Sequence, residues 1–314
     1  MFGGLGERVG TAGAYVMDRT SGILWRNQRS ESEASSNAFD PPPLTDRDLQ
    51  AIVKLVYEKA GITLHEGKRA LITARLQKRL RETGARTFAD YLKVVENDRT
   101  GSELVVLLDS IATNHTSFFR EPEHFQFLTQ KVVPEWTTSN PGAPLDVWSA
   151  ACSSGEEPYT LAVTLHDTLP NADKGRFRIL ASDLSTKVLR IAEQGVYKME
   201  RVEGIPIETL RRHFERGMGA QEGLARVSST LRQRIEFRQL NLLEIGSLDR
   251  TFGVIFCRNV MIYFDRQVQQ RVVSMLERHL RPGGYLFISH SESLNGVTHG
   301  LRWVAPAIYQ RRTS

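Results

Sequence analysis

Apolar side chains recur at helical spacing from about residue 44 to residue 113. Leu49, Ile52 and Val56 follow one another at intervals of three and four residues, which predicts an amphipathic helix. Thr45 and Asp48 precede this stripe with the spacing of a helix N-terminal cap. Three further helices are expected over residues 65–81, 88–95 and 104–111. We expect the four helices to form a small N-terminal bundle.

The pattern changes at residue 144, where short apolar runs begin to alternate with helical stretches. The expected strands cover residues 145–150, 177–181, 235–240, 254–257 and 285–289, and the expected helices cover 156–168, 185–194 and 266–280. Such alternation predicts an α/β domain with a doubly wound, mostly parallel sheet. Residues 281–284, Arg-Pro-Gly-Gly, should turn the chain from the last helix into the next strand, and residues 303–309 should form an edge strand.

Three segments fall outside this alternation. Residues 1–43 are rich in Gly, Ser, Glu, Arg and Pro and poor in periodic apolar positions, so we expect a disordered or loose tail. Residues 114–143 connect the helical domain to the domain that we expect over 144–314. Residues 196–234 interrupt the alternation and predict an inserted subdomain with a β-hairpin. Its exposed edge is either a place for an extended peptide to add as a strand or a decoration of the fold.

The composition is that of an ordinary globular protein. Of its 314 residues 40% are hydrophobic and 25% charged, and no apolar run approaches the roughly 20 residues that span a bilayer. The first residues lack the apolar region of a secretory signal, so we expect a cytoplasmic protein. The two cysteines, Cys152 and Cys257, are too few for a disulfide framework and belong to no Cys/His cluster. We expect small buried thiols and no metal.

The net charge of +5 favours acidic partners, which include nucleic acid, anionic lipid and acidic protein surfaces. One expected helix concentrates basic residues at offsets of three, four and seven. These residues are Lys68, Arg69, Arg75, Lys78 and Arg79. Two interpretations are open for them: a docking surface for an acidic partner, or an ordinary solvated helix face.

The candidate chemistry lies where the parallel strands end, because ligands of such sheets sit beyond the carboxyl ends of the strands. After residues 145–150 come small residues, then Gly155, Glu156 and Glu157. Two successive carboxylates repel phosphate and suit a cation, which favours the sulfonium cofactor S-adenosylmethionine over NAD or ATP. The alternative is that both carboxylates simply favour the N-terminus of the following helix.

Two further strand ends carry polar residues. Asp183 follows the second strand, where a carboxylate accepts hydrogen bonds from ribose hydroxyls, and it could equally cap the next helix. Asn241 and Leu242 follow the third strand, where an amide and an apolar neighbour can bind adenine. An asparagine in this place is also common in turns.

The chain contains three dense polar and aromatic strings: Asn-His-Thr-Ser-Phe-Phe-Arg-Glu-Pro at 114–122, Ser-Ala-Ala-Cys-Ser-Ser-Gly-Glu-Glu-Pro-Tyr at 149–159 and Cys-Arg-Asn-Val-Met-Ile-Tyr-Phe-Asp at 257–265. In this order they resemble the CheR family, the chemotaxis receptor methyltransferases. The resemblance covers residues 44–311. It implies a class I S-adenosylmethionine-dependent methyltransferase that esterifies glutamate side chains of membrane chemoreceptors for sensory adaptation, releasing S-adenosylhomocysteine.

Carried over residue by residue, the resemblance implies a set of site residues. Arg120 and Tyr263 would be catalytic. Contacts with the cofactor would come from Asn114, Thr116, Arg120, Glu157, Asp183, Asn241, Leu242, Arg258 and Asn259. The basic helix would dock on the cytoplasmic helical region of the receptors, and the inserted subdomain would hold a receptor C-terminal peptide. The protein would be recruited to receptor arrays without inserting into the membrane or binding nucleic acid.

Three rival functions differ from this one in substrate, catalysis or pathway. A nucleic-acid methyltransferase would share the fold, but the chain shows no dense aromatic and basic interleaving, and Cys257-Arg258-Asn259-Val260 does not match the Asn/Asp-Pro-Pro-Tyr string of amino methyltransferases. A non-catalytic sensor of S-adenosylmethionine would not need Arg120 and Tyr263. A chemosensory pathway with an output other than motility would leave the sequence unchanged.

Overall fold

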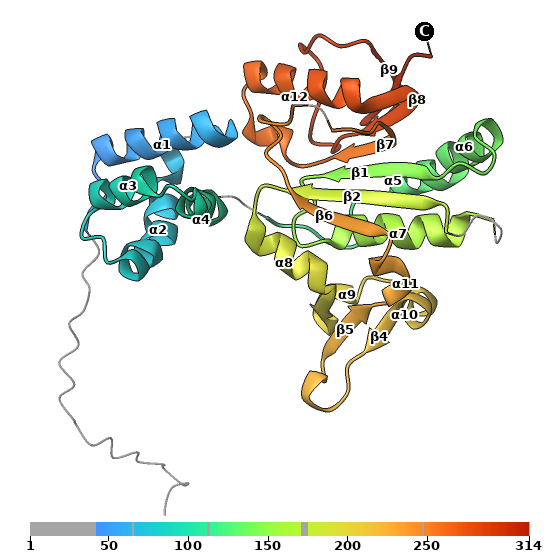
Figure 1. Cartoon of the computed structure of the whole chain (residues 1–314), viewed down its shortest axis with the longest axis horizontal. Coiled ribbons are helices and arrows are strands. Elements are labelled where there is room, and N and C mark those ends of the chain that lie inside the picture. The colour runs from blue at the N-terminus through green and yellow to red at the C-terminus, as the bar shows by residue number, and fades with distance from the viewer. Residues whose placement is uncertain (1–41, 65, 112–113, 171–174, 247, 314) are drawn as a thin grey trace, which may run out of the picture. The chain divides into compact units, whose positions relative to one another are not determined.

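The structure, a computed structural model, describes residues 42–64, 66–111, 114–170, 175–246 and 248–313 (Figure 1). The tail expected over residues 1–43 lies outside these residues apart from its last two. Within the described ranges, no helix is long and apolar enough to cross a membrane.

The N-terminal domain consists of helices, as expected. They are α1 (Asp46–Ala60), α2 (Arg69–Thr83), α3 (Phe88–Asn97) and α4 (Ser102–Ile111). The Thr45 hydroxyl accepts a hydrogen bond from the Asp48 backbone N–H at 3.1 Å, which confirms the predicted cap. The second helix starts later than expected, because a short 3-10 helix (Glu66–Lys68) precedes it. Ile52, Leu76 and Phe88 are completely buried where the helices pack together.

The larger domain is built on a seven-stranded sheet with the order β6-β2-β1-β7-β8-β10-β9. Its strands are β1 (Leu145–Ala150), β2 (Phe177–Asp183), β6 (Ile235–Gln239), β7 (Phe252–Cys257), β8 (Leu280–Phe287), β9 (Leu301–Ala305) and β10 (Ile308–Arg311). In this order, each strand from β6 to β8 runs parallel to the next one. Strand β10 is antiparallel to both of its neighbours, β8 and β9. The strand order reverses between β1 and β7, which makes the carboxyl edge of these strands the expected ligand site.

Helices cover both faces of the sheet, which confirms the doubly wound fold (Figure 1). Alternate residues of β1 belong to different cores: Val147 packs in the core that includes Tyr159 of α7 (Glu156–Thr168), and Trp148 packs in the core that includes Val272 of α12 (Arg266–His279). Helix α8 (Thr186–Gln194) follows β2. Both cores are fully buried, as the apolar character of the central strands predicts.

The C-terminal part differs from expectation in two places. Helix α12 ends at His279, one residue before the predicted end, and β8 already begins at Leu280, so residues 281–284 lie within this strand. The run 303–309, expected as one strand, is divided between β9 and β10. Ala307 has a φ of 59° in the turn that separates them. Apolar periodicity does not show this turn, and its left-handed residue is neither Gly nor Asn; Pro306, which occupies the turn, was the available signal.

The segment that joins the two domains contains helices that the sequence pattern did not predict. These are α5 (Pro122–Phe127), a π-helical stretch (Leu128–Val132) and α6 (Val133–Ser139). Phe125, Leu128 and Val132 are buried in the same core as β1 and α7. The segment is therefore packed against the sheet along much of its length.

The predicted insertion forms a separate antiparallel sheet with the order β3-β5-β4. Its strands are β3 (Val196–Lys198), β4 (Phe214–Arg216) and β5 (Leu224–Val227), and its helices are α9 (Met199–Val202), α10 (Ile207–His213) and α11 (Ser229–Arg232). The Phe118 ring contacts Tyr197 and Phe214 edge-on, with centroid distances of 5.0 and 5.7 Å. These contacts attach the insertion to the segment that follows the helical domain.

Candidate active site and cofactor cavity

A cavity lies at the carboxyl ends of β1, β2, β6 and β7, where strand order reverses. It is open to solvent, and its empty space of about 1180 Å³ includes the open mouth. All ten residues predicted for cofactor binding or catalysis line it: Asn114, Thr116, Arg120, Glu157, Asp183, Asn241, Leu242, Arg258, Asn259 and Tyr263. The structure thus brings together residues from five separate stretches of the chain, and their roles stay predictions.

Strained backbone is concentrated around this cavity. Ala151 and Ser153 adopt left-handed φ values of 67° and 50° in the turn after β1. Gly155 has a φ of 97°, and a Cβ atom there would lie 2.8 Å from the Tyr197 hydroxyl oxygen, so glycine is required on two grounds. Such conformations cost of order 1–3 kcal/mol each for residues other than glycine and cluster at functional sites.

Asp183 holds this turn in place. Its carboxylate accepts hydrogen bonds from the backbone N–H of Ser153 at 2.8 Å and from that of Ser185 at 2.9 Å. The alternative of a helix cap is wrong, because the Ser185 side chain caps α8 by accepting from Val188 N–H. Burial raises the pKa of the Asp183 carboxyl, and the backbone donors lower it. Asp183 also lines the cavity, where its remaining lone pairs can accept from hydroxyl groups.

The two carboxylates at the start of α7 have different surroundings. Glu156 is completely buried and forms an ion pair with Arg201 of α9, and it does not line the cavity. Glu157 does line it, accepts from the Ser149 hydroxyl at 2.7 Å and lies 3.3 Å from Arg258. Burial raises the pKa of Glu157, and Arg258 opposes that rise. The expectation that both carboxylates suit a cation therefore applies to Glu157 alone.

Arg258 connects three segments beneath the cavity. Its side chain is 2% exposed and pairs with Glu121 at 3.0 Å as well as with Glu157. It also donates to the Arg120 carbonyl oxygen at 2.5 Å. Burial would raise the pKa of Glu121, but the Ser289 hydroxyl and the Arg258 charge outweigh burial, and the pKa lies below its usual value. Arg258 thus fixes the backbone from which the Arg120 side chain extends.

The Asn241 side chain forms a hydrogen bond with the helical domain. Its side-chain amide donates to the Lys59 carbonyl oxygen at 2.7 Å, and its side-chain oxygen accepts from Leu243 N–H at 3.1 Å. The side chain therefore ties the end of β6 to the last turn of α1. Its neighbour Leu242 supplies an apolar part of the cavity wall.

Glu292 is a site residue that the sequence analysis missed. Its carboxylate accepts from the backbone N–H groups of Asn259 at 3.1 Å, Met261 at 2.8 Å and Ser289 at 2.8 Å. Burial raises its pKa despite these donors. Glu292 thereby positions the loop that carries Asn259 and Tyr263. The signal was available, because the string Ser-His-Ser-Glu-Ser lies at the end of an expected strand, as do the strings at 149–159 and 257–265.

The helical domain forms another wall of the cavity. Residues Ile62 and Phe264 form an antiparallel bridge, and Thr63 N–H donates to the Tyr263 carbonyl oxygen at 2.8 Å. The Lys68 ammonium group lies 5.5 Å from the centroid of the Tyr263 ring and lines the same cavity. Lys68, predicted for docking, is therefore placed beside the predicted catalytic tyrosine.

The other four predicted docking residues do not form a uniformly free surface. Arg69 donates to the Leu44 carbonyl at 2.7 Å, Arg75 donates to the Ile111 carbonyl at 2.8 Å, and Arg79 pairs with Glu103 of α4 at 2.5 Å. Lys78 is 75% exposed and pairs only loosely, at 3.6 Å, with Glu82. Arg75 and Arg79 therefore hold α2 against α4, and the docking role of the five basic residues stays a prediction.

Comparisons with known proteins agree with this fold and cavity. Residues 114–308 match the family described as "CheR methyltransferase, SAM binding domain", and residues 47–112 match "CheR methyltransferase, all-alpha domain". The fold and the matched domain define an S-adenosylmethionine-dependent methyltransferase. More specifically, the chain belongs to the CheR methyltransferase family.

Curated relatives match over most of their length. The Klebsiella aerogenes "Chemotaxis protein methyltransferase" is 40% identical over 90% of this chain and 95% of its own. The Escherichia coli K12 protein of the same name is 40% identical over 80% of this chain and 86% of its own. The "Chemotaxis protein methyltransferase 2" of Pseudomonas aeruginosa is 41% identical over 84% and 93%, respectively.

Proposed function

We propose that the protein transfers a methyl group from S-adenosylmethionine to glutamate side-chain carboxylates of membrane chemoreceptors. The products are glutamyl methyl esters and S-adenosylhomocysteine. The names of the relatives support a role in chemotaxis. One observation carries the proposal most directly: Arg120, Tyr263 and Lys68 line the same cavity as the predicted cofactor residues.

The cavity suits S-adenosylmethionine. Asp183 offers acceptors for hydroxyl groups, Glu157 offers negative charge for a cationic ligand, and Leu242 offers an apolar surface. The turn after β1 lets a ligand approach the backbone closely, because Ala151 and Ser153 are small. When bound, S-adenosylmethionine supplies an electrophilic methyl group on a positively charged sulfur.

The proposed acceptor needs no general base. A glutamate side chain has a pKa of about 4.3, so its carboxylate is ionised and nucleophilic at pH 7. The protein has to align this carboxylate with the methyl group and remove water from it. This requirement differs from that of a hydroxyl acceptor, whose proton must be removed.

Arg120 and Tyr263 are proposed to position the incoming carboxylate. The Arg120 guanidinium donates to the His115 carbonyl at 3.1 Å and lines the cavity, and the Tyr263 ring lies beside the Lys68 ammonium. A cation that held the carboxylate too tightly in the ground state would slow its attack. We therefore assign Arg120 and Tyr263 to orientation and Lys68 to attraction of the acidic side chain.

Two surfaces are proposed to bind the receptor. Lys78 projects from α2 and provides an exposed positive charge for an acidic helical surface, while Arg69, Arg75 and Arg79 contribute mainly by shaping the domain. Strand β4 lies at the edge of the inserted sheet, where a receptor C-terminal peptide could add as a strand. Recruitment to receptor arrays would follow from these contacts.

The proposal is tested by transfer of radiolabel from methyl-labelled S-adenosylmethionine to receptor-containing membranes of the native host, followed by mild alkali. Carboxyl methyl esters hydrolyse under these conditions and release volatile label. The matched control uses membranes whose receptors carry Gln in place of the accepting glutamates. These membranes come from a strain that lacks the enzyme activity that converts such Gln side chains to Glu. We expect base-labile label in the first membranes and a strong reduction in the second.

Two other results would contradict the proposal. Base-stable label would point to an amino or nucleic-acid acceptor. Absence of transfer to native membranes despite tight cofactor binding would favour a non-catalytic sensor.

A further inference from the structure

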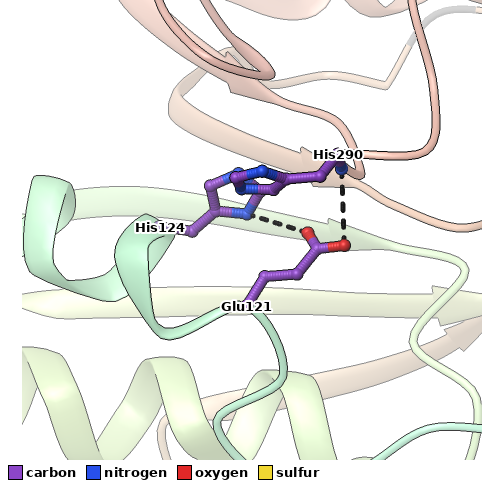
Figure 2. Close-up of side chains that lie close together, drawn as sticks. All are labelled: Glu121, His124 and His290. Carbon is purple, nitrogen blue, oxygen red and sulfur yellow. Dashed lines mark hydrogen bonds and ion pairs between the residues drawn. The ribbon is translucent and has the colours of Figure 1, made fainter.

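Three side chains with metal-binding groups converge next to the cofactor cavity. Glu121 precedes α5, His124 lies within α5, and His290 lies in the loop after β8 (Figure 2). One potential ligand atom from each residue lies within 4.8 Å of those of the other two. The sequence did not predict a metal site because these ligands come from segments that are distant along the chain.

His124 is an unusual buried side chain. It is completely buried, and neither of its ring nitrogens has a hydrogen-bond partner within the described ranges. The great majority of buried polar side-chain atoms do have such a partner, so this ring calls for an explanation. Its Nδ1 atom lies 3.3 Å from the Glu121 Oε2 atom.

His290 lies at the exposed side of the cluster. Its ring centroid is 4.7 Å from that of His124, and the two rings overlap in Figure 2. Ligand atoms of one tetrahedral zinc ion are about 3.4 Å apart, given metal–ligand distances of about 2.1 Å. The distance of 3.3 Å between Glu121 and His124 already matches that value. Because His290 is exposed, its side chain can adjust to bring a ring nitrogen to bonding distance.

We propose that Glu121, His124 and His290 form a binding site for a divalent transition-metal ion of the zinc class. Two imidazoles and one carboxylate are a common ligand set for such ions, and water would complete the coordination. The site opens toward solvent at His290 and is closed at His124. Binding would satisfy one ring nitrogen of His124, neither of which has a hydrogen-bond partner among the described residues.

Metal binding at this place would affect the cofactor cavity. The Glu121 carboxylate that binds the ion also pairs with Arg258 at 3.0 Å. Arg258 would keep Glu157 and the Arg120 carbonyl oxygen as partners, so the cost of sharing Glu121 is limited. Arg120 directly precedes Glu121 in the chain. We therefore assign the site to inhibition by metal, through weakening of the pair between Glu121 and Arg258, which lines the cavity.

A second cluster provides an internal control. His166, Asp167 and His213 also lie within 4.8 Å of one another. Here, however, His213 Nε2 is 2.8 Å from Asp167 Oδ1, and Arg212 pairs with the same oxygen atom at 3.2 Å. Because His213 Nε2 already has a hydrogen-bond partner, whereas neither ring nitrogen of His124 has one among the described residues, we assign no metal to this cluster.

The test is a titration of the full chain, without a polyhistidine tag, with Co²⁺ as a spectroscopic substitute for Zn²⁺. Visible absorption bands of four-coordinate Co²⁺ report binding independently of activity. We expect one site in the wild type and affinity at least about 10-fold weaker in His290→Ala. His166→Ala should bind like the wild type. His290 is exposed, and thermal melting of the apo variants would verify that both are folded.

Two results would overturn the site. The first is the absence of stoichiometric Co²⁺ binding by the wild type. The second is an affinity for Co²⁺ that is the same in His290→Ala as in the wild type. Loss of Co²⁺ binding in His166→Ala alone would belong to this second result, because it would place the ion in the other cluster. Inhibition is measured separately, as Zn²⁺-dependent loss of methyl transfer that His290→Ala relieves, and Zn²⁺ that binds without slowing transfer would refute the inhibitory role alone.

Discussion

Helix α2 and the wall of the cofactor cavity are both rich in arginine, but their arginines have different surroundings. On α2, Arg79 pairs with Glu103, and Arg75 donates to the backbone at the end of α4. Both arginines of the cavity line it, but Arg258 is 2% exposed and pairs with Glu121 and Glu157, whereas the Arg120 guanidinium donates to the His115 carbonyl oxygen. Basic residues in a sequence therefore divide into those that hold the structure together and those that face a ligand. Only the three-dimensional partners distinguish the two groups.

The largest effect should come from Arg258. The substitution Arg258→Met leaves Glu121 and Glu157 without their buried positive partner. We expect the free energy of unfolding to fall by about 3–5 kcal/mol, measured by urea denaturation. Arg266→Met, at an exposed position of α12, should change it by less than about 0.5 kcal/mol. Similar stability of the two variants would contradict a structural role for Arg258.

Arg79 should have a smaller structural effect. Arg79→Glu places like charges beside Glu103, whose other hydrogen bond comes from the Tyr91 hydroxyl at 2.8 Å. The pair is partly exposed, so we expect a loss of about 2 kcal/mol of unfolding free energy, between the values for surface and buried pairs. The additional change Glu103→Arg should restore part of this loss. If the double variant recovered no unfolding free energy, the ion pair between Arg79 and Glu103 would not be the contact that holds α2 against α4.

At the cavity, Arg120 should affect catalysis more than stability. We expect Arg120→Ala to lower kcat/KM for receptor methylation by about 10-fold or more, which corresponds to at least about 1.4 kcal/mol. Initial rates at varied S-adenosylmethionine concentrations would separate cofactor binding from the transfer step. Near-normal turnover of this variant would remove Arg120 from the catalytic residues.

The smallest effect should come from Lys78. Lys78→Glu should lower kcat/KM for receptor about threefold at low salt, because an exposed charge at an interface mainly affects association. Lys93→Glu on α3 is the matched control, because Lys93 is 68% exposed and also pairs with a nearby carboxylate. KM for S-adenosylmethionine should not change in either variant. Equal rates for both variants would argue against docking through Lys78.

Much of the fold was predictable because its elements have clear periodicity. The bounds of β1 and α7 match their apolar patterns, since a buried central strand is apolar along its length and α7 starts directly after Gly155. The helices from residue 122 to residue 139 were missed, because several of their buried residues pack in an irregular π-helical stretch. The β9–β10 hairpin was missed although Pro306 occupies its turn, because the left-handed residue there is neither Gly nor Asn.

The location of the site was predictable, but the partners of its residues were not. Asp183 and Arg258 follow strands, and the rule for ligands in parallel sheets places both at one edge. The bond from Asn241 to Lys59 and the position of Lys68 beside Tyr263 depend on how the helical domain packs. Glu292 was missed although it follows a strand, because it was not part of the strings that resemble the family.

A crystal structure of the protein with S-adenosylhomocysteine tests the central claim most directly. The account predicts that the product fills the cavity at the carboxyl edge of β1, β2 and β7, with its ribose beside Asp183 and its sulfur toward Tyr263. Product bound elsewhere on the protein, or a cavity that stays empty at saturating product, would contradict it.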